Sequence, residues 1–414
     1  MTCCLNLSMK IFSSLKHVNF RFFWFGQLVS LSGTWVQTIA QGWLVLELTN
    51  SAFLLGVINA ISAMPIMLFS LLGGVVADRL NKKYILFTTQ AFSMILAFCL
   101  GVLVSLKLAA FWNIAIIAAL LGLVNAFDVP TRQSFVVEMV GKGDLNNAIA
   151  LNSLLFNAAR IIGPVIAGFL AGWLGIASCF YVNAISFLAV IVALIFIKGN
   201  FAPKDLSQRS IAEGMIDGAR YVLSHKNIRS LVIITAISSI FGMANVVLMP
   251  IFARDILKVG VTGLGFLMAA IGVGAIIGAL TLAKFSNYKE KRIFIKSGTI
   301  ILAVSLILFS ISTSYWLSLL LLLAAGWGII TQAATINTLL QLETPDNLRG
   351  RVMSFFTMMF LGMTPVGSFF AGVMAYWFGA PTALLTSGIA CLILTPIFFK
   401  NILLEKSEVK YAIC

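Results

Sequence analysis

The chain has 414 residues, of which 60% are hydrophobic and 10% are charged, and its mean hydropathy is +1.02. This composition excludes an ordinary soluble domain. Hydrophobic runs of about 20 residues recur along the chain, which predicts an all-α membrane protein that crosses the lipid bilayer many times. The formal net charge is +14, which in a soluble protein would suggest a nucleic-acid partner. Because the basic residues lie in loops between apolar runs, we expect no nucleic-acid partner and attribute the charge to membrane topology.

The six cysteines are scattered, and the chain has only two histidines. None of the cysteines forms a C-x-x-C pair, so we expect no structural metal, no cofactor and no disulfide framework. The first apolar run, after Arg21, is too long for the core of a signal peptide and lacks a small-residue cleavage site. We interpret this run as the first spanning helix.

The apolar runs predict twelve spans, at residues 20–46, 52–77, 84–106, 109–135, 146–173, 177–198, 229–252, 262–284, 292–313, 315–341, 349–377 and 381–400. An even number of spans places both termini on one side, and 24 of the 28 Lys and Arg residues fall on that side. The opposite side has Lys107, Arg254 and Lys258, and Arg160 lies within a span. The positive-inside rule therefore predicts cytoplasmic termini in a multi-pass protein of the bacterial inner (plasma) membrane.

The first span carries a polar stripe. Its members recur at gaps of three and four residues, which puts them on one helix face: Gln27, Ser30, Thr34, Gln37 and Gln41. Uncharged amides facing lipid would be costly, so we expect this face to point into the protein. Five polar side chains in a row favour the lining of a water-filled cavity, and hydrogen bonding between helices is the alternative.

A short charged loop separates the second and third spans. Its sequence, from Gly73 to Tyr84, has the pattern G-x-x-x-D-R-x-x-K-K, formed by Gly74, Asp78, Arg79, Lys82 and Lys83. We expect the glycines to let two helices approach closely and Asn81 to adopt the left-handed conformation of a tight turn. The pattern resembles the loop between the second and third helices of major facilitator superfamily transporters, where glycine usually stands in place of Asn81. A plain cytoplasmic cap is the alternative interpretation.

The fourth and fifth spans carry the most specific signature. It comprises the segments DVPTRQS (128–134), LNNA (145–148) and NAARIIGPVIAG (157–168). Together they resemble the drug-efflux branch of the superfamily, which includes macrolide and enterobactin exporters, and the resemblance spans nearly the whole chain. Gly163, Pro164 and Gly168 are similar to a fifth-helix motif of exporters. Proline removes a backbone hydrogen bond and the glycines permit close packing, so this helix is expected to bend at a gate or to hold a static kink.

The fifth span also carries a polar stripe, formed by Asn146, Ser153, Asn157 and Arg160. Arg160 is the one charge placed clearly inside a predicted span, which makes it a candidate for function. Two interpretations stay open. The guanidinium could attract an anionic ligand, or it could pair structurally with Asp128 or Glu138.

Three parts of the chain are expected: an N-terminal six-helix bundle (1–200), a cytoplasmic amphipathic linker (201–228) and a C-terminal six-helix bundle (229–414). In the linker, Ile211, Met215, Ala219 and Val222 recur at helical spacing. This pattern predicts a helix lying on the inner membrane surface, with a flexible tether as the alternative.

The two halves repeat with an offset of 204 residues. The offset pairs Gly74 with Gly278, Tyr84 with Tyr288, Gly163 with Gly367, Gly168 with Gly372 and Gly175 with Gly379. We therefore predict two pseudo-symmetric bundles, the major facilitator fold. Asp78 falls on Leu282, so the acidic loop is absent from the second half. Cavity-lining candidates in the second half, beside Asn157 in the first, are Asn245, Thr335 and Met359.

The resemblance implies contacts for a cytoplasmic gate. Asp78 would dock at the start of the eleventh helix, near residues 348–351, and Arg79 would meet Asp128. The gate motif would comprise Gly74, Asp78, Arg79, Lys82, Lys83, Asp128 and Arg132. The resemblance also implies proton antiport, although no carboxylate lies at mid-depth. Glu47 and Asp128 are the nearest proton-coupling candidates.

These features favour a secondary transporter over an enzyme. A phosphate-binding G-x-x-x-x-G-K-[ST] loop is absent from the sequence, which disfavours an ATP-driven pump. His17 and His225 fall in cytoplasmic segments, away from any nucleophile in a span, so an intramembrane enzyme is a remote alternative. We expect a monomeric, proton-coupled exporter of a drug-like or siderophore-like small molecule that works by alternating access. Uptake of a sugar or another nutrient is the second interpretation.

Overall fold

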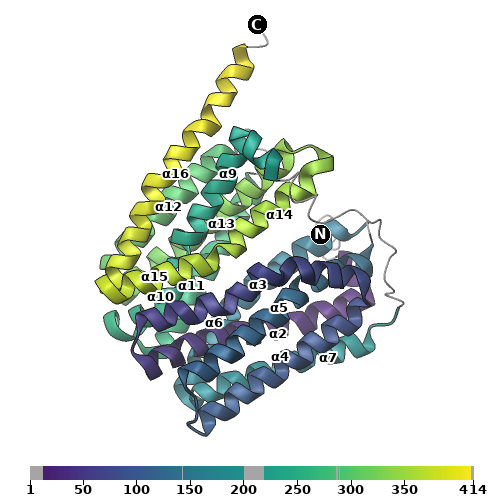
Figure 1. Cartoon of the computed structure of the whole chain (residues 1–414), viewed down its shortest axis with the longest axis vertical. Helices are drawn as coiled ribbons and strands as arrows, with labels where there is room; N and C mark the ends of the chain where they lie inside the picture. Colours follow the sequence, from purple (N-terminus) through teal and green to yellow (C-terminus); the bar gives the residue numbers. More distant parts are fainter. Residues whose placement is uncertain (1–12, 142, 200–218, 286–287, 289, 412–414) are drawn as a thin grey trace, which may run out of the picture. The chain divides into compact units, whose positions relative to one another are not determined.

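The computed structural model describes residues 13–141, 143–199, 219–285, 288 and 290–411, and throughout this part of the chain the regular structure is helical (Figure 1). A helix satisfies every backbone N–H and C=O group within one segment, which a lipid environment requires. The chain divides into two compact units. Unit 1 comprises Met1–Thr49, Ile61–Leu206 and Gly260–Ala269, and unit 2 comprises Asn50–Ala60, Ser207–Val259 and Ala270–Cys414.

The first half of the chain forms these helices: η1 (Ser13–Lys16), α2 (Val18–Thr49), α3 (Ala52–Arg79), α4 (Lys82–Ser105), α5 (Phe111–Val140), α6 (Leu145–Leu174) and α7 (Ile176–Phe196). Helix α2 packs mainly against α7 and α6, and α4 packs against α7 and α5. Aromatic side chains fill the core near the start of α2, where the rings of Phe23 and Phe135 meet edge to face at 5.5 Å. Helix α2 therefore lies at the centre of unit 1 and presents its polar stripe to several neighbours.

The second half forms these helices: α9 (Lys226–Ile237), η2 (Ser238–Gly242), α10 (Ala244–Ile251), η3 (Phe252–Ile256), α11 (Gly260–Lys284), α12 (Arg292–Ile311), α13 (Tyr315–Glu343), α14 (Asp346–Gly362), α15 (Thr364–Phe378) and α16 (Ala380–Tyr411). Helix α12 packs against α13 and α16, and α16 also packs against α9. The stacked rings of Phe252 and Phe309 join η3 to α12 with centroids 4.6 Å apart.

Every predicted span coincides with helix, and 11 helices in the described ranges are long and apolar enough to cross a membrane. The first predicted span, α2, is helical over 32 residues but is not among those 11. Its buried amides and hydroxyls lower its hydropathy. This is expected where a helix turns its polar face to other helices instead of to lipid.

Two spans are interrupted in ways that the sequence analysis does not predict. The seventh runs through α9, a π-helical turn at Ser238–Gly242, α10 and a second π-helical turn at Phe252–Ile256. The eleventh breaks at Met363 between α14 and α15, where Pro365 stands in the first turn of the new helix. Proline lacks the N–H that a continuous helix would use, so the break follows from the sequence.

The predicted repeat is visible in the backbone. Gly175 joins α6 to α7 with φ +82°, and Gly379 joins α15 to α16 with φ +83°. Both torsions lie in the region that favours glycine, so the same turn is built from the same residue in each half. The fold is therefore the predicted all-α membrane fold made of two related halves.

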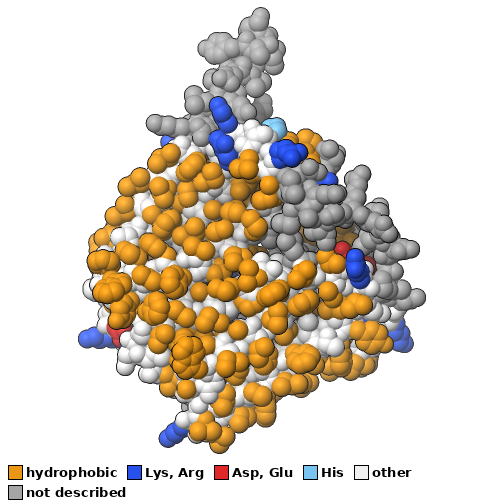
Figure 2. All heavy atoms as spheres, in the orientation of Figure 1, with side chains coloured by type: hydrophobic (Ala, Val, Ile, Leu, Met, Phe, Trp, Pro, Cys, Tyr) orange, Lys and Arg blue, Asp and Glu red, His pale blue; other side chains and the backbone are white. Residues whose placement is uncertain are grey.

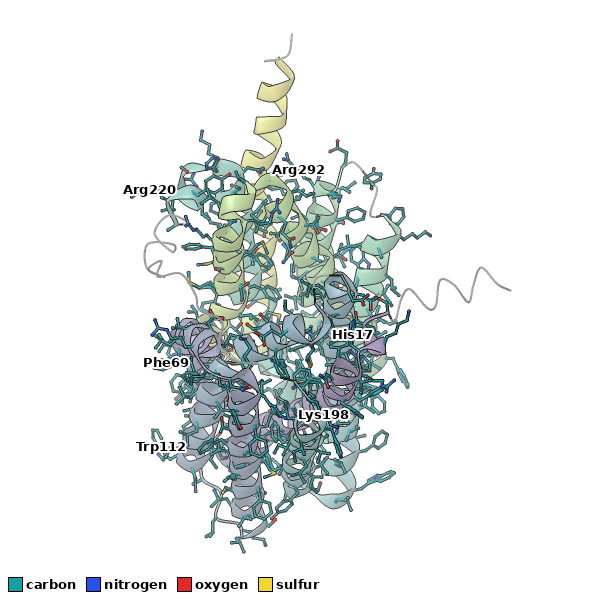
Figure 3. All side chains as sticks on the ribbon, turned by 90° about the vertical axis from the view of Figure 1, so that its right-hand side faces the viewer. His17, Phe69, Trp112, Lys198, Arg220 and Arg292 are labelled. Atoms are coloured by element: carbon teal, nitrogen blue, oxygen red, sulfur yellow. The ribbon has the colours of Figure 1, made fainter. Side chains whose placement is uncertain are left out.

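Exposed side chains fit a lipid environment. Hydrophobic side chains cover most of the face shown in Figure 2. Trp112 and Trp173, at the first turn of α5 and the last turn of α6, are 74% and 81% exposed, and Trp112 projects from the surface in Figure 3. Trp316 and Trp377 occupy the matching ends of α13 and α15 in unit 2 and are 74% and 72% exposed. Tryptophans at helix ends are typical of a membrane–water interface.

The predicted linker lies mostly outside the described residues, including Ile211 and Met215. Its last part, residues 219–224, is helical, and Val222 is buried against Ile228 and Leu231 in the core of unit 2. Placement of the linker on the membrane surface stays a prediction.

Candidate functional site

A charged cluster is buried in unit 1 between α2, α4 and α5. Asp128 and Arg132 lie one turn apart on α5, are 3% and 6% exposed, and form an ion pair of 3.8 Å between Oδ2 and Nη1. From α4, Thr89 Oγ1 and Gln90 Nε2 donate hydrogen bonds to Asp128 Oδ1 at 3.0 and 2.9 Å. The carboxylate therefore has one cation and two neutral donors within one buried cluster.

Helix α2 completes the cluster. Arg132 Nη1 donates to Gln27 Oε1 at 2.9 Å, while Gln27 Nε2 is buried without a hydrogen-bond partner. Ser30 Oγ donates to Gln90 Oε1 at 3.3 Å, so Ser30, Gln90 and Asp128 form a chain of donors and acceptors. A buried donor without a partner costs free energy, so Gln27 marks a place where a rearrangement of the cluster would gain a hydrogen bond.

The polar stripe of α2 serves mainly to join helices. Gln37, 5% exposed, accepts a hydrogen bond of 2.6 Å from Asn183 on α7. Gln27 and Ser30 are also buried and bond to neighbouring helices, so three of the five stripe residues take part in contacts between helices. The geometry favours the alternative interpretation for these three. Thr34 and Gln41 are half-buried, so cavity lining stays a prediction for them.

Arg160 lies near the middle of the 30-residue helix α6, and its guanidinium sits over the ring of Trp35 at 5.8 Å from the centroid. Asn157, one turn earlier, donates to the carbonyl of Ser153 at 2.9 Å. Trp35, Asn157 and Arg160 are half-buried. This part of unit 1 is the one place inside its described spans where a cation lies beside an aromatic ring without a carboxylate.

The fifth-helix motif consists of positions where backbones approach closely. A Cβ at Gly163 would collide with Cβ of Trp35 on α2, and a Cβ at Gly168 would lie 3.0 Å from the carbonyl oxygen of Thr262. Thr262 Oγ1 also donates to the Gly168 carbonyl at 3.0 Å. Pro164 lies within α6, and a Cβ at Gly265 would collide with its carbonyl. The motif therefore permits α6 to pack directly on α2 and on the first turns of α11.

The loop between α3 and α4 differs from the expectation in two respects. Asn81 has φ −66° and ψ 113°, and its side chain caps α4 by accepting from the Lys83 N–H at 3.0 Å; it does not adopt the left-handed conformation. The glycine in close contact is Gly73, where a Cβ would collide with the Ala126 carbonyl, whereas a Cβ at Gly74 would meet nothing within 4 Å. A capping asparagine explains why this loop does not require the family's glycine.

Lys82 and Lys83 fix the N-terminal end of α4. Lys82 Nζ, almost fully buried, pairs with Glu138 Oε1 at 2.9 Å, and Lys83 Nζ donates to the Ile197 carbonyl at 2.8 Å. Asp78 and Arg79 are exposed, and in this described part of the chain Arg79 forms no ion pair within 4.0 Å. The carboxylate of Asp128 is paired with Arg132 instead. The docking of Asp78 near residues 348–351 stays a prediction.

Unit 2 has a neutral counterpart of the charged cluster. Gln332 on α13 donates through Nε2 to Thr299 Oγ1 on α12 at 2.5 Å and accepts from Ser238 Oγ at 2.7 Å. A small cavity of about 10 Å³, room for about one water molecule, adjoins these groups. The cavity is lined by Thr235, Ser238, Met243, Ile329, Gln332, Ala333, Ile336 and Phe360. The polar pattern of the sequence does not single out Gln332 as a cavity residue, although the repeat offset maps Asp128 onto Gln332.

The candidates named in the second half have different surroundings. Asn245 is fully buried and neither its Nδ2 nor its Oδ1 has a hydrogen-bond partner. Thr335 is buried and donates to the Thr331 carbonyl at 2.7 Å, and Met359 packs on the hydrophobic core. None of the three lines the cavity beside Gln332. Their role in ligand binding stays a prediction.

Glu47 and Asp144 lie outside these clusters in unit 1. Glu47 is exposed near the end of α2 and accepts from Trp43 Nε1 at 2.5 Å. Asp144, before α6, pairs with His17 Nε2 at 2.9 Å and accepts from Ser13 Oγ at 2.9 Å. The hydrogen bond from His17, reinforced by that from Ser13, holds the pKa of the Asp144 carboxyl below its ordinary value. Of the two proton-coupling candidates, only Asp128 is buried among charged and polar partners.

At one end of unit 2, Arg292 Nη2 pairs with Glu343 Oε1 at 3.4 Å, and Asn227 Nδ2 donates to Glu343 Oε2. Arg292 and Arg220 both lie at the end of unit 2 where α16 extends (Figure 3). The Arg292–Glu343 pair joins the start of α12 to the end of α13, as Lys82 and Glu138 join α4 to α5. Within the described ranges, no group of three or more His, Cys, Asp and Glu side chains is arranged to hold a metal ion.

These helices, with buried polar clusters inside two repeated halves, define a membrane transporter. The chain belongs to the transmembrane secretion effector family of the major facilitator superfamily, which matches residues 9–412. It is a secondary transporter and not an enzyme.

Curated relatives support this assignment. The chain is 26% identical to the multidrug efflux pump Tap of Mycolicibacterium fortuitum over 85% of this chain and 88% of that protein. It is 27% identical to the staphyloferrin A transporter of Staphylococcus aureus over 92% and 95% of the two chains. It is 23% identical to the enterobactin exporter EntS of Shigella boydii, over 82% and 81%. The predicted resemblance to this exporter branch is confirmed.

A crystal structure supports the fold. A bacterial homologue of the human lysosomal transporter Spinster superposes with a TM-score of 0.74 at 15% identity, covering 93% of this chain and 96% of that chain. The predicted major facilitator fold is confirmed.

Proposed function

We propose that this transporter exports a small organic compound by alternating access and that inward proton movement drives the export. The buried Asp128–Arg132 cluster is the observation that carries the coupling proposal. Burying two charges costs several kcal/mol per ion unless their geometry offsets it, so a charged pair inside a bundle is costly if only packing is required. A carboxyl that gains and loses a proton during transport would explain why this costly pair is present inside the bundle.

Protonation of Asp128 would remove the negative charge that Arg132 faces. The guanidinium would keep its hydrogen bond to Gln27, whose second amide atom is without a partner. Thr89 and Gln90 donate hydrogen bonds to the charged carboxylate, and these bonds would weaken when the carboxyl becomes neutral. The contacts between α2, α4 and α5 would therefore change with the protonation state, which is what coupling requires.

Alternating access is supported by the glycine contacts. Gly168 and Gly265 remove side chains from the contact between α6 and α11 in unit 1, and Gly56 and Gly372 do the same between α3 and α15 in unit 2. Gly168 and Gly372 are equivalent positions of the repeat, so the same kind of close glycine contact occurs in both halves. Backbone surfaces without interlocking side chains permit helices to shift against each other.

The direction of transport and the ligand class are proposed from the relatives. Two of them are named as an efflux pump and an exporter, and a third as a staphyloferrin A transporter. We infer export of a drug-like or siderophore-like compound across the bacterial inner membrane, by a monomer with cytoplasmic termini. The basic loops support that orientation, which would place the helix ends with the exposed tryptophans at the membrane–water interface away from the cytoplasm.

Reconstitution tests the proposed coupling. The purified chain is placed in liposomes with an imposed pH gradient, and the movement of a fluorescent organic anion such as calcein is recorded with and without ATP. We expect movement that follows the pH gradient and ignores ATP. Asp128→Asn should abolish the gradient-driven part, while the exposed-loop variant Lys107→Gln serves as control. Movement that survives the collapse of every ion gradient would contradict proton coupling.

A further inference from the structure

Arg160 is a cation inside a membrane span without a counter-charge. Its described surroundings offer no carboxylate within 4.0 Å and no hydrogen-bond acceptor, and its close partner is the ring of Trp35. A cation–π contact stabilises less than the removal of a guanidinium from water costs. The contact positions the side chain but leaves its charge unneutralised.

The carboxylates that could have paired with Arg160 are engaged elsewhere. Asp128 pairs with Arg132, and Glu138 pairs with Lys82. These were the two structural partners that the sequence left open. Because both carboxylates are already paired, the geometry favours the interpretation in which the Arg160 guanidinium attracts an anionic ligand.

Trp35 is held in place by its own surroundings. Gly163 has no side chain at the point where Cβ of Trp35 meets α6, and the indole packs beside Leu31, Leu155 and Ala159. Gly163 follows Arg160 by one helical turn. The glycine of the exporter motif therefore seats the ring against which the guanidinium lies.

The neighbouring surface is polar although it lies within a span. Thr38 and Ser153 are exposed, and Asn157 is half-buried one turn before Arg160. A guanidinium and several hydroxyl or amide groups facing lipid would be costly, so this face must border water or polar groups. The exposed faces of α4 and α7 carry large apolar side chains instead, such as Phe92, Phe98 and Ile195.

We propose that Arg160 and Trp35 form a binding site for an organic anion. A ligand carboxylate would pair with the planar guanidinium, and the planar apolar part of the ligand would pack beside the indole. The proposal rests on the proposed function, export of a small organic compound, and adds the chemical class of that compound: a carboxylate attached to a flat apolar group.

Binding to the detergent-purified protein tests the site without any transport step. The probes are 2-naphthoate and its uncharged analogue 2-naphthamide, titrated by calorimetry at about pH 7, where a carboxyl is ionised. We expect the parent to bind the carboxylate about tenfold or more tightly than the amide, as one charge-assisted contact predicts. Arg160→Gln should remove this preference, whereas Arg160→Lys should retain part of it because the charge remains.

Two further variants distinguish a site from a general effect of charge. Arg21→Gln removes an exposed cation at the start of α2 and should leave the preference unchanged. Trp35→Leu should weaken both probes several-fold and keep the preference for the carboxylate. Each variant is compared with the parent by size-exclusion profile and thermal midpoint, so a folding defect is recognised.

Equal binding of the two probes by the parent, or no measurable binding of either, would overturn the assignment of an anion site. A preference unchanged in well-folded Arg160→Gln would also overturn it. Preserved anion binding together with transport that ignores a pH gradient would contradict the proposed coupling and leave the site intact. The two proposals are thereby tested separately.

Discussion

The fourth span of unit 1 and the tenth span of unit 2 place a polar side chain at equivalent positions, but only one of them is charged. Asp128 and Gln332 are separated by the repeat offset of 204 residues, and both bond to the helix before them, through Gln90 and Thr299. Gln332 shows that neutral groups suffice to join these helices. We therefore propose that the charge of Asp128 serves a purpose other than packing.

The largest effect is expected from removing that charge. Asp128→Asn leaves Arg132 buried without its counter-ion, which should lower the free energy of unfolding by about 3 kcal/mol and abolish transport driven by a pH gradient. Asp128→Asn combined with Arg132→Gln imitates the neutral cluster of unit 2. It should recover most of the stability without recovering transport. Chemical denaturation in detergent and liposome assays measure the two properties. A double variant that transports like the parent would show that the cluster is only structural.

A somewhat smaller effect is expected from adding a charge to the neutral cluster. Gln332→Glu places a carboxyl beside Ser238 and Thr299, which offer no cation to neutralise its charged form. The variant should then be destabilised by about 2 kcal/mol at alkaline pH and recover as the pH falls and the carboxyl becomes neutral. Gln341→Glu, at an exposed position of the same helix, is the matched control. Equal pH profiles for the two variants would mean that unit 2 accommodates the charge as unit 1 does.

The ion pairs that join the start of one helix to the end of the next give a third contrast. Lys82 and Glu138 are 5% and 17% exposed at their side chains, against 19% and 26% for Arg292 and Glu343. Removing one partner of the more buried pair should cost more, about 2–3 kcal/mol for Lys82→Met against about 1 kcal/mol for Arg292→Met. Unfolding by denaturant measures both. A reversed order would show that exposure does not set the strength of these pairs.

The smallest effect is expected at Asp144, where stability depends on pH for a reason unrelated to proton coupling. The pKa of Asp144 is lowered by His17 and Ser13, so its contribution to stability is present above the unfolded carboxyl value near about pH 4 and is lost as the pH falls through the folded value. Asp144→Asn should flatten the stability profile only at that acid end. Thermal midpoints recorded from acid to neutral pH test this. A change near neutral pH would assign part of the transport profile to this loop instead of Asp128.

Periodicity in the sequence predicted the helices and their polar faces better than it predicted which residues on neighbouring helices bond to those faces. The spacing of Gln27, Ser30 and Gln37 shows that they share a face, but their partners are single polar residues in apolar helices. Asn183 has no repeating pattern around it, so its bond to Gln37 could not be read from the sequence. The number of polar groups suggested a cavity because a sequence does not reveal how many acceptors the neighbouring helices supply.

Other differences do have a signal in the sequence. Pro365 indicates that the eleventh span breaks, and the repeat offset identifies Gln332 once Asp128 is singled out. The preference of asparagine for N-caps could likewise have predicted the conformation of Asn81. The π-helical turn at Ser238–Gly242 has no comparable signal, because it depends on packing against several helices at once.

That π-helical turn also affects how the chain tolerates changes in length. Deleting one residue from a regular buried helix rotates everything after it by about 100°, which turns core side chains outward. A π-helical turn already holds about one residue more than an α-helical turn. Removing one residue from Ser238–Gly242 would let the segment close as an α-helix, with Thr235 before it and Asn245 after it still on their original faces. Among the buried helices of unit 2, this turn is a place where a single-codon deletion leaves the flanking core in register.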